Sequence, residues 1–387
     1  MKKLLSSLVL LGVCIFGIQA QSESPVTPYK SAYFEVTSDL GIDDAALLAR
    51  EMDLMFEVFN HLFRFDTKSM PGLFRVKAFG TADAYNNYVV SQLGRIREGA
   101  IYLHYIRPER RELIVHRDGG TSHKLLAHQA FIQFIRGFIP YPPSWMREGF
   151  AIFFSTLEYS AEKDELTYEE NLAWLETVKS WGAKAPSMES ILLADIDGIP
   201  EHFQPASWAM VSFLLNSGNE DYMRTLFESF MLLTPKATAA ENTLAVMQRM
   251  SSWLNSETMK KDYSTYFTSR RTFAEFIEEG RAAYVAKEPL RAELLFLGAL
   301  DLRPSHYAPY YYLGLLAYEA KNYDIAEQYY RSALQYGADT ALLQYALGLN
   351  ALSAGRIDDA RYYLRQASEG SPERYKPRVE ELLKQLN

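Results

Sequence analysis

The feature that most restricts the fold of this 387-residue chain is a 34-residue period near its C-terminus. Small residues recur in three columns at this spacing, and a fourth column holds bulky residues. Small residues at fixed offsets let the two helices of a hairpin approach closely, and a large residue fills the space between them. The period therefore predicts a stack of three helical hairpins. The columns are Gly280, Gly314 and Gly348; Ala292, Ala326 and Ala360; Ala299, Ala333 and Ala367; and Phe296, Tyr330 and Leu364.

These columns resemble the tetratricopeptide repeat, a family whose 34-residue unit carries small and aromatic residues at fixed positions. The resemblance implies an all-α solenoid. A helix from about Pro377 to Leu386, within a capping segment at 375–387, is expected to cover the last apolar face. The three repeats are placed at 273–306, 307–340 and 341–374.

The same resemblance implies a protein or peptide partner, held on the inner surface formed by the first helix of each repeat. An alternative is that several of these aromatic residues only pack against a neighbouring repeat or the preceding domain, because large aromatic side chains bury readily. Carried over by position, the expected groove comprises Arg281, Tyr284, Tyr311, Leu315, Tyr318, Tyr345 and Leu349.

The first 20 residues have the pattern of a secretory signal peptide, with two lysines, a nearly continuous apolar run and Ala20 at a cleavage site. We therefore expect an exported protein of the periplasm or cell envelope. Cys14 lies inside the apolar run, and Val13 is larger than the residue that usually precedes a lipid-modified cysteine. A soluble form is favoured over a lipid-anchored one. No later segment is apolar for long enough to span a membrane.

Composition excludes several classes of protein. The hydrophobic fraction of 48% suffices for packed cores, so the chain is not disordered, and its single cysteine excludes a disulfide scaffold. Lys and Arg number 40 against 48 Asp and Glu, a formal net charge of −8, and no long basic run occurs. A nucleic-acid partner is therefore not expected.

Residues 28–272 predict an α+β domain in which strands come first and helices follow. Beyond residue 122 the pattern is almost entirely helical. We expect the strands to form an antiparallel sheet with helices packed on it. Short runs with alternating apolar residues predict strands at 31–36 and 73–79, and two further strand-like runs lie at 100–105 and 112–116.

Two helices joined by a proline-rich connector are the most distinctive part of this domain. The first stops at Gly137, and Ser144 is expected to cap the second, at 145–154. The pair resembles the active-site helices of gluzincin metallopeptidases, specifically the peptidase MA-like domains of exported bacterial proteins. In that family the first helix carries H-E-x-x-H and the second carries a glutamate that also binds zinc.

The resemblance places His128 and Glu148 at zinc-ligand positions, but the other two motif positions lack the necessary chemistry. Ile132 replaces the second imidazole and has no lone pair for a metal ion. Gln129 replaces the carboxylate that takes a proton from zinc-bound water, and a neutral amide cannot do so. We therefore expect no catalytic residue, no metal and no cofactor, and interpret the domain as an inactive relative of these peptidases.

Other interpretations remain open. A zinc-dependent peptidase with an atypical site would need His202 to join His128 and Glu148, since the loop position of His202 is unconstrained. In an ordinary structural interpretation, His128 is a hydrogen-bonded core residue and Glu148 stabilises the positive end of a helix dipole. All recognition would then lie in the repeats. The favoured hypothesis is an exported, non-catalytic scaffold that binds a protein or peptide.

Overall fold

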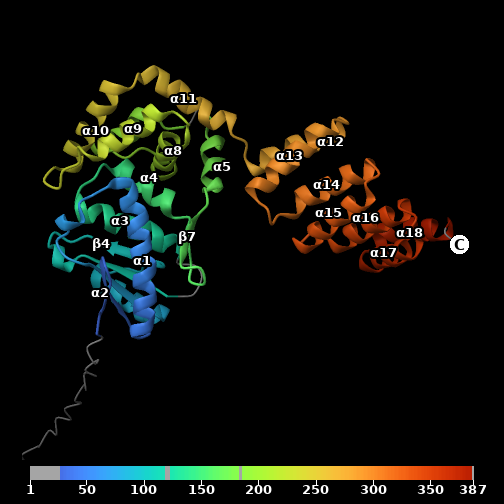
Figure 1. Cartoon of the computed structure of the whole chain (residues 1–387), viewed down its shortest axis with the longest axis horizontal. Helices are drawn as coiled ribbons and strands as arrows, with labels where there is room; N and C mark the ends of the chain where they lie inside the picture. Colours follow the sequence, from blue (N-terminus) through green and yellow to red (C-terminus); the bar gives the residue numbers. More distant parts are fainter. Residues whose placement is uncertain (1–26, 118–122, 183–184, 386–387) are drawn as a thin grey trace, which may run out of the picture. The chain divides into compact units, whose positions relative to one another are not determined.

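The computed structural model describes residues 27–117, 123–182 and 185–385 (Figure 1). The predicted signal peptide and Cys14 lie outside the described residues. Contacts divide the chain into two compact units. The first unit runs to Pro140 and includes 157–168, and the second contains 141–156 and the chain from Glu169 onward. The domain boundary predicted between residues 272 and 273 thus falls inside the second unit.

The first unit contains a five-stranded sheet of mixed direction, so the prediction of an antiparallel sheet is wrong. The central strands β2, β3 and β5 are parallel, and only the edge strands β1 and β4 pair antiparallel. Helix α1 (Ile42–Phe63) connects β2 to β3, and a crossover of this kind joins parallel strands. In spatial order the strands are β1 (Tyr29–Lys30), β2 (Phe34–Ser38), β3 (Phe74–Phe79), β5 (Glu112–His116) and β4 (Ala100–Leu103).

Aromatic side chains pack α1 and α3 (His123–Phe138) together. Phe56 and Phe134 meet edge to face with ring centroids 5.2 Å apart, and Phe59 and Phe131 do so at 5.3 Å. Gly137 permits close approach to the sheet, because a Cβ atom there would lie 2.2 Å from the ring of Phe74. Helix α2 (Ala82–Leu93) forms a separate cluster, in which Tyr85 and Val89 contact Leu103 and Ile114.

A hairpin of β6 (Leu157–Ser160) and β7 (Glu165–Tyr168) also belongs to the first unit, although the sequence pattern beyond residue 122 predicts almost only helix. Its strands have only four residues each, and β7 is mostly exposed, although apolar residues alternate with polar ones in both strands. Asp164 in the turn has φ 51°, and its carboxylate lies 2.7 Å from Arg50 on α1. This ion pair fixes the hairpin to the helix.

The second unit is helical and begins with α4 (Ser144–Phe154), which packs on α8 (Phe203–Asn216). A Cβ atom on Gly149 would lie 2.4 Å from the carbonyl oxygen of Ser207, so only glycine allows this approach. The remaining helices before residue 273 are α5 (Leu172–Ser180), α6 (Met188–Leu192), α7 (Ala194–Asp197), α9 (Glu220–Phe230), α10 (Ala239–Trp253) and α11 (Ser256–Ser269).

Ser144 does not cap α4 with its own side chain, which corrects the prediction. Pro143 occupies the N-cap position. The carboxylate of Asp195 accepts hydrogen bonds from the Ser144 backbone N–H at 2.7 Å and from its Oγ at 2.5 Å. A carboxylate at this end of the helix accepts a hydrogen bond from a free backbone N–H and stabilises the positive end of the helix dipole. A serine cap would also have satisfied a free N–H.

Three helical hairpins follow, as the 34-residue period predicts. We call these hairpins and the helix that follows them, α18 (Pro372–Gln385), the hairpin array, which is coloured orange to red in Figure 1. Helix α18 packs on the last hairpin and begins five residues before the predicted Pro377, because proline is well tolerated in a first turn. The hairpins are α12 (Phe273–Val285) with α13 (Pro289–Leu302), α14 (Tyr307–Glu319) with α15 (Tyr323–Gln335), and α16 (Thr340–Ser353) with α17 (Ile357–Gly370).

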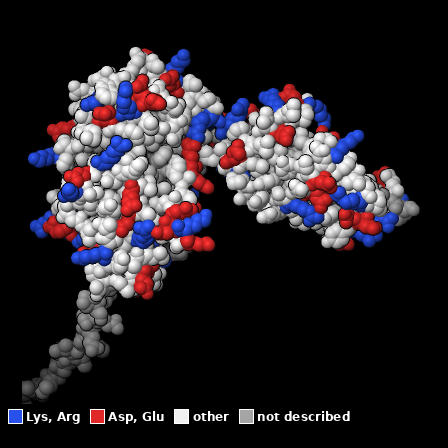
Figure 2. Space-filling model, in the orientation of Figure 1, with Lys and Arg blue, Asp and Glu red and all other residues white. Residues whose placement is uncertain are grey.

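The repeat columns make the predicted contacts inside each hairpin. A Cβ atom on Gly314 would lie 2.5 Å from Cε1 of Tyr330, and one on Gly348 would lie 2.8 Å from Leu364. Within the described chain, no helix is long and apolar enough to cross a bilayer. Figure 2 shows acidic and basic side chains interspersed on the visible face.

Candidate functional site

The hairpin array contains a cavity of about 260 Å³ between α14, α16 and α18. Five of the seven residues expected to form the groove line it: Tyr311, Leu315, Tyr318, Tyr345 and Leu349. All five are half-buried, which is the exposure of a groove wall rather than of a core. The spacing of the repeats brings them together, since equivalent positions of successive hairpins lie side by side in a stack.

Three of these tyrosines also make contacts inside the array. Tyr345 stacks on Tyr375 with ring centroids 4.9 Å apart, and the hydroxyl of Tyr318 lies 3.0 Å from Oγ of Ser353. Tyr311 lies 6.4 Å from the buried ring of Tyr330. Packing and pocket lining are therefore not alternatives here, because each of these residues contacts the array while part of it stays exposed.

Arg281 and Tyr284, the two groove candidates of the first hairpin, do not line this cavity. The guanidinium of Arg281 lies 3.3 Å from Glu278 on the same helix. The hydroxyl of Tyr284 donates to Glu319 at 2.5 Å, and this carboxylate also lies 3.4 Å from Lys287. Both side chains are engaged in surface polar contacts at the first hairpin.

Sequence reasoning did not assign the contribution of α18, from which Arg374, Tyr375 and Arg378 line the cavity. Both arginines are exposed, and neither forms an ion pair with a residue in the described part of the chain. Tyr375 is 4% exposed, and its hydroxyl has no hydrogen-bond partner among the described residues. The four-residue spacing of the arginines, which puts them on one side of a helix, is the signal that could have found them.

The two arginines make this end of the cavity electropositive. Burial raises the pKa of the Tyr375 hydroxyl, while Arg374, and more weakly Arg378, act to lower it. Burial likewise raises the pKa of Tyr311, with Arg374 acting in the opposite direction. Both phenols are therefore neutral at physiological pH, and the cavity combines aromatic walls, uncharged hydroxyls and two cationic groups.

The degenerate motif of the first unit lies on α3, where His128, Gln129 and Ile132 are all half-buried. The side-chain oxygen of Gln129 accepts a hydrogen bond from the backbone N–H of Tyr102 on β4 at 2.9 Å, and its amide nitrogen lies 3.1 Å from Nδ1 of His128. One turn later, Gln133 donates to the backbone oxygen of Arg75 on β3 at 2.9 Å. These two amides hold the helix to the sheet.

Glu148 and His202 lie in the second unit and line the same cavity, of about 370 Å³. The Glu148 carboxylate accepts a hydrogen bond from Nε of Arg147 at 3.0 Å, and the His202 ring stacks on Trp181 at 4.9 Å. Across residues 27–117, 123–182 and 185–385, no three His, Cys, Asp or Glu side chains are grouped to hold a metal ion. The guanidinium of Arg147 beside Glu148 disfavours a second cation at this carboxylate.

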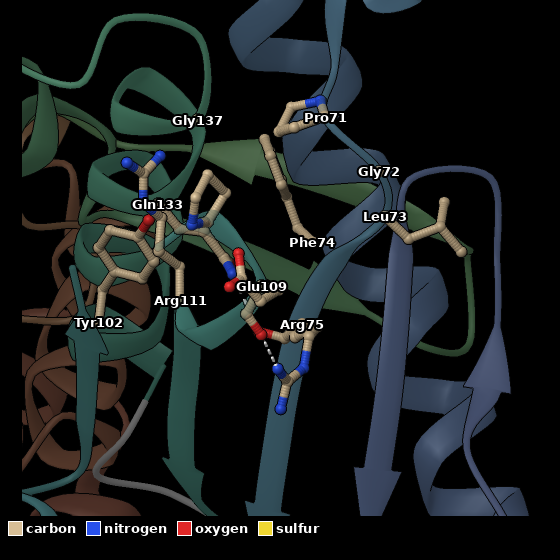
Figure 3. Close-up of a pocket in the computed structure, with 11 residues that line it drawn as sticks. Pro71, Gly72, Leu73, Phe74, Arg75, Tyr102, Glu109, Arg111, Gln133 and Gly137 are labelled. Carbon is tan, nitrogen blue, oxygen red and sulfur yellow. Dashed lines mark hydrogen bonds between the residues drawn. The ribbon is translucent and has the colours of Figure 1, made fainter. Parts of the chain in front are cut away.

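A further cavity of about 340 Å³ lies between β3, β4 and α3 (Figure 3). Its polar side chains are largely used for internal contacts: Arg75 donates to the backbone oxygen of Glu109, and Nε of Arg111 donates to that of Tyr105 at 2.8 Å. Burial raises the pKa of the Tyr102 hydroxyl to about 12, so it remains protonated. The polar side chains named here are thus engaged within the fold or uncharged.

Comparisons with solved structures find similarity to tetratricopeptide repeat domains. No family model matches the sequence, and no curated protein matches it. Among solved structures, the Arabidopsis OM64 TPR domain is 21% identical and covers 29% of this chain and 94% of its own, with a TM-score of 0.28. The N-terminal domain of stress-induced protein-1 from C. elegans is 19% identical and covers 30% and 93%, with a TM-score of 0.27.

The first TPR of Spaghetti (RPAP3), solved with the HSP90 peptide SRMEEVD, is 12% identical and covers 30% of this chain and 89% of its own, with a TM-score of 0.28. At these identities and scores, none of the three structures assigns a ligand or an activity to this chain.

Proposed function

We propose that this protein is a scaffold that binds a segment of a partner protein in the cavity between α14, α16 and α18. The observation that carries the proposal is that five of the seven residues expected to form the groove, by their position in the tetratricopeptide repeat, line one cavity and are half-buried. Aromatic side chains already held by contacts within the array bind a partner with little loss of side-chain freedom. A leucine-sized side chain buried among them contributes about 1.5–3 kcal/mol.

Site-specific photocrosslinking of the full chain tests this proposal. The photoreactive residue p-benzoylphenylalanine replaces Tyr345 in the cavity or, as a control, Tyr362, which is 60% exposed on α17 and does not line the cavity. We expect a discrete crosslinked partner from position 345 and none from position 362. Equal crosslinking from both positions, or none from either, would contradict the proposed site.

We further propose that residues 28–272 are an inactive relative of gluzincin metallopeptidases. Support comes from the four motif positions, because Ile132 has no donor atom and Gln129 is a hydrogen-bonded amide. The expected result is less than about 0.1 zinc per purified chain by elemental analysis. We also expect no proteolytic activity that a chelator removes. Stoichiometric zinc that His128→Ala removes would overturn the inactive assignment.

Export to the cell envelope is also part of the proposal, on the pattern of the first 20 residues. Intact mass of the protein from its native cells is expected to place the new N-terminus at Gln21. A chain that retains Met1, or that carries lipid on Cys14, would contradict it.

A further inference from the structure

We infer that the occupant of the cavity is an extended peptide segment that presents apolar side chains followed by two acidic side chains at alternate positions. This inference rests on the proposed function, since it specifies the chemistry of the partner at the same site. The evidence lies at the α18 end of the cavity, where Arg374 and Arg378 adjoin the aromatic and aliphatic wall.

Charge complementarity favours an anionic group at this end. Neither arginine has a carboxylate partner within the described residues, whereas nearby arginines of the array do: Arg331 lies 2.7 Å from Glu327, and Arg356 lies 2.7 Å from the same residue. Asp339, the acidic residue that acts on the Tyr375 hydroxyl, is already used as the cap of α16. The two guanidiniums are thus left to an outside partner.

The buried hydroxyl of Tyr375 adds a neutral donor beside the two cations. It has no acceptor among the described residues, and the Arg374 guanidinium lies 5.2 Å from the centre of the same ring. A buried polar group without a partner is costly, so an acceptor supplied by the occupant would remove part of that cost. Carboxylate oxygens accept hydrogen bonds from both guanidinium and hydroxyl donors.

The spacing of the arginines selects the spacing of the acids. Positions four apart on a helix are separated by about 6 Å along its axis. Alternate residues of an extended peptide are about 6.6 Å apart and point to the same side. Two carboxylates at alternate positions can therefore face the two guanidiniums together.

The apolar side chains of the peptide are inferred from the cavity residues other than the two arginines. Leu315, Leu342 and Leu349 lie among the tyrosines and offer no charge. In an extended peptide, the residues that share a side with the two acids continue along this wall. The matching order is apolar, apolar, acidic, acidic on one side of the peptide, with small polar residues between them.

The experiment is a calorimetric titration of the full chain with the peptide Ser-Phe-Ser-Leu-Ser-Asp-Ser-Asp-Gly, acetylated and amidated so that it has no terminal carboxylate. The matched peptide has Asn in place of both Asp residues. We expect the Asp peptide to bind about three- to tenfold more tightly, because each exposed ion pair contributes modestly. Raising NaCl from about 0.05 M to 0.5 M should remove most of this difference by screening.

Protein variants identify the groups responsible. The double variant Arg374→Gln with Arg378→Gln keeps the helix but should make the two peptides bind equally. Lys376→Gln is the matched control, since Lys376 is exposed on the same helix and does not line the cavity. It should leave the preference unchanged. Circular dichroism and thermal melting establish that each variant is folded.

The outcomes separate this inference from the function on which it rests. If both peptides bind equally to the unaltered chain, and the arginine variants have no effect, the acidic preference is wrong while peptide binding stands. Binding of neither peptide would contradict both. A preference for Asp that survives the double variant would place the acidic segment elsewhere and overturn the role of α18.

Discussion

Gly314 shows how a single position of the repeat is fixed by its neighbour across the hairpin. A Cβ atom there would lie 2.5 Å from the ring of Tyr330, which is 1% exposed. In an open helix, Gly→Ala stabilises by about 1 kcal/mol. We predict the opposite sign for Gly314→Ala, a loss of about 1–3 kcal/mol, because the buried ring has to shift.

Urea unfolding of the full chain, followed by a signal from the array, measures this change. Thr265→Ala on α11, an exposed helical position outside the array, provides the comparison and should change stability by less than about 0.5 kcal/mol. An increase in stability for Gly314→Ala would mean that the close contact with Tyr330 is absent.

At the residue scale, a contact can be predicted from the sequence where both of its residues recur at a fixed spacing in every repeat. The glycine and ring columns lie 16 residues apart in every unit, as Gly314 and Tyr330 do, so their contact was predictable. The cap of α4 was not, because Asp195 lies 51 residues from Ser144 and nothing in the local pattern connects them. The same holds for Arg374 and Arg378, whose place in the cavity depends on how α18 packs.

Among the elements, α14 begins at a titratable residue, His306, whose Nδ1 accepts a hydrogen bond from the backbone N–H of Ala308 at 3.2 Å. Burial, and next the Arg303 guanidinium, lower the pKa of His306. The unfolded chain therefore binds the proton more readily, and stability falls as the pH drops from the unfolded value of about 6.5 toward the lower folded pKa.

The variant His306→Asn tests this pH dependence, because Asn is a good N-cap that does not titrate in this range. We expect the array of the variant to lose less stability than the original between pH 7.5 and pH 5.0, measured by urea unfolding at both values. Its stability at pH 7.5 should remain within about 1 kcal/mol. Equal losses on acidification in both proteins would show that His306 is not the responsible group.

The strands and helices themselves were predicted more successfully than their arrangement. Alternating apolar residues mark β3, a continuous apolar run marks β5, and helical spacing marks α1, because burial leaves these patterns in the sequence. Strand direction leaves no such trace, so the parallel pairing of β2, β3 and β5 was missed. The hairpin at 157–168 was also missed, because its two alternating strands have only four residues each and give too short a signal.

For the whole molecule, the central proposal is that the partner binds in the cavity of the hairpin array and not in the first unit. Any ligand that binds only the folded array stabilises it, and amides that exchange through its unfolding should slow by about 100-fold at a ligand concentration 100 times the Kd. Amides of the first unit should not respond. The two units therefore serve as each other's internal control.

Hydrogen–deuterium exchange of the full chain, with and without the acetylated Asp peptide, is the most direct test of where the peptide binds. The account predicts slower exchange in α14, α16 and α18 and unchanged exchange in α2 and β5. The double variant Tyr345→Ala with Leu349→Ala should abolish the effect while keeping the helical content. Slower exchange in α3 and β4 of the first unit, with none in the array, would contradict the account.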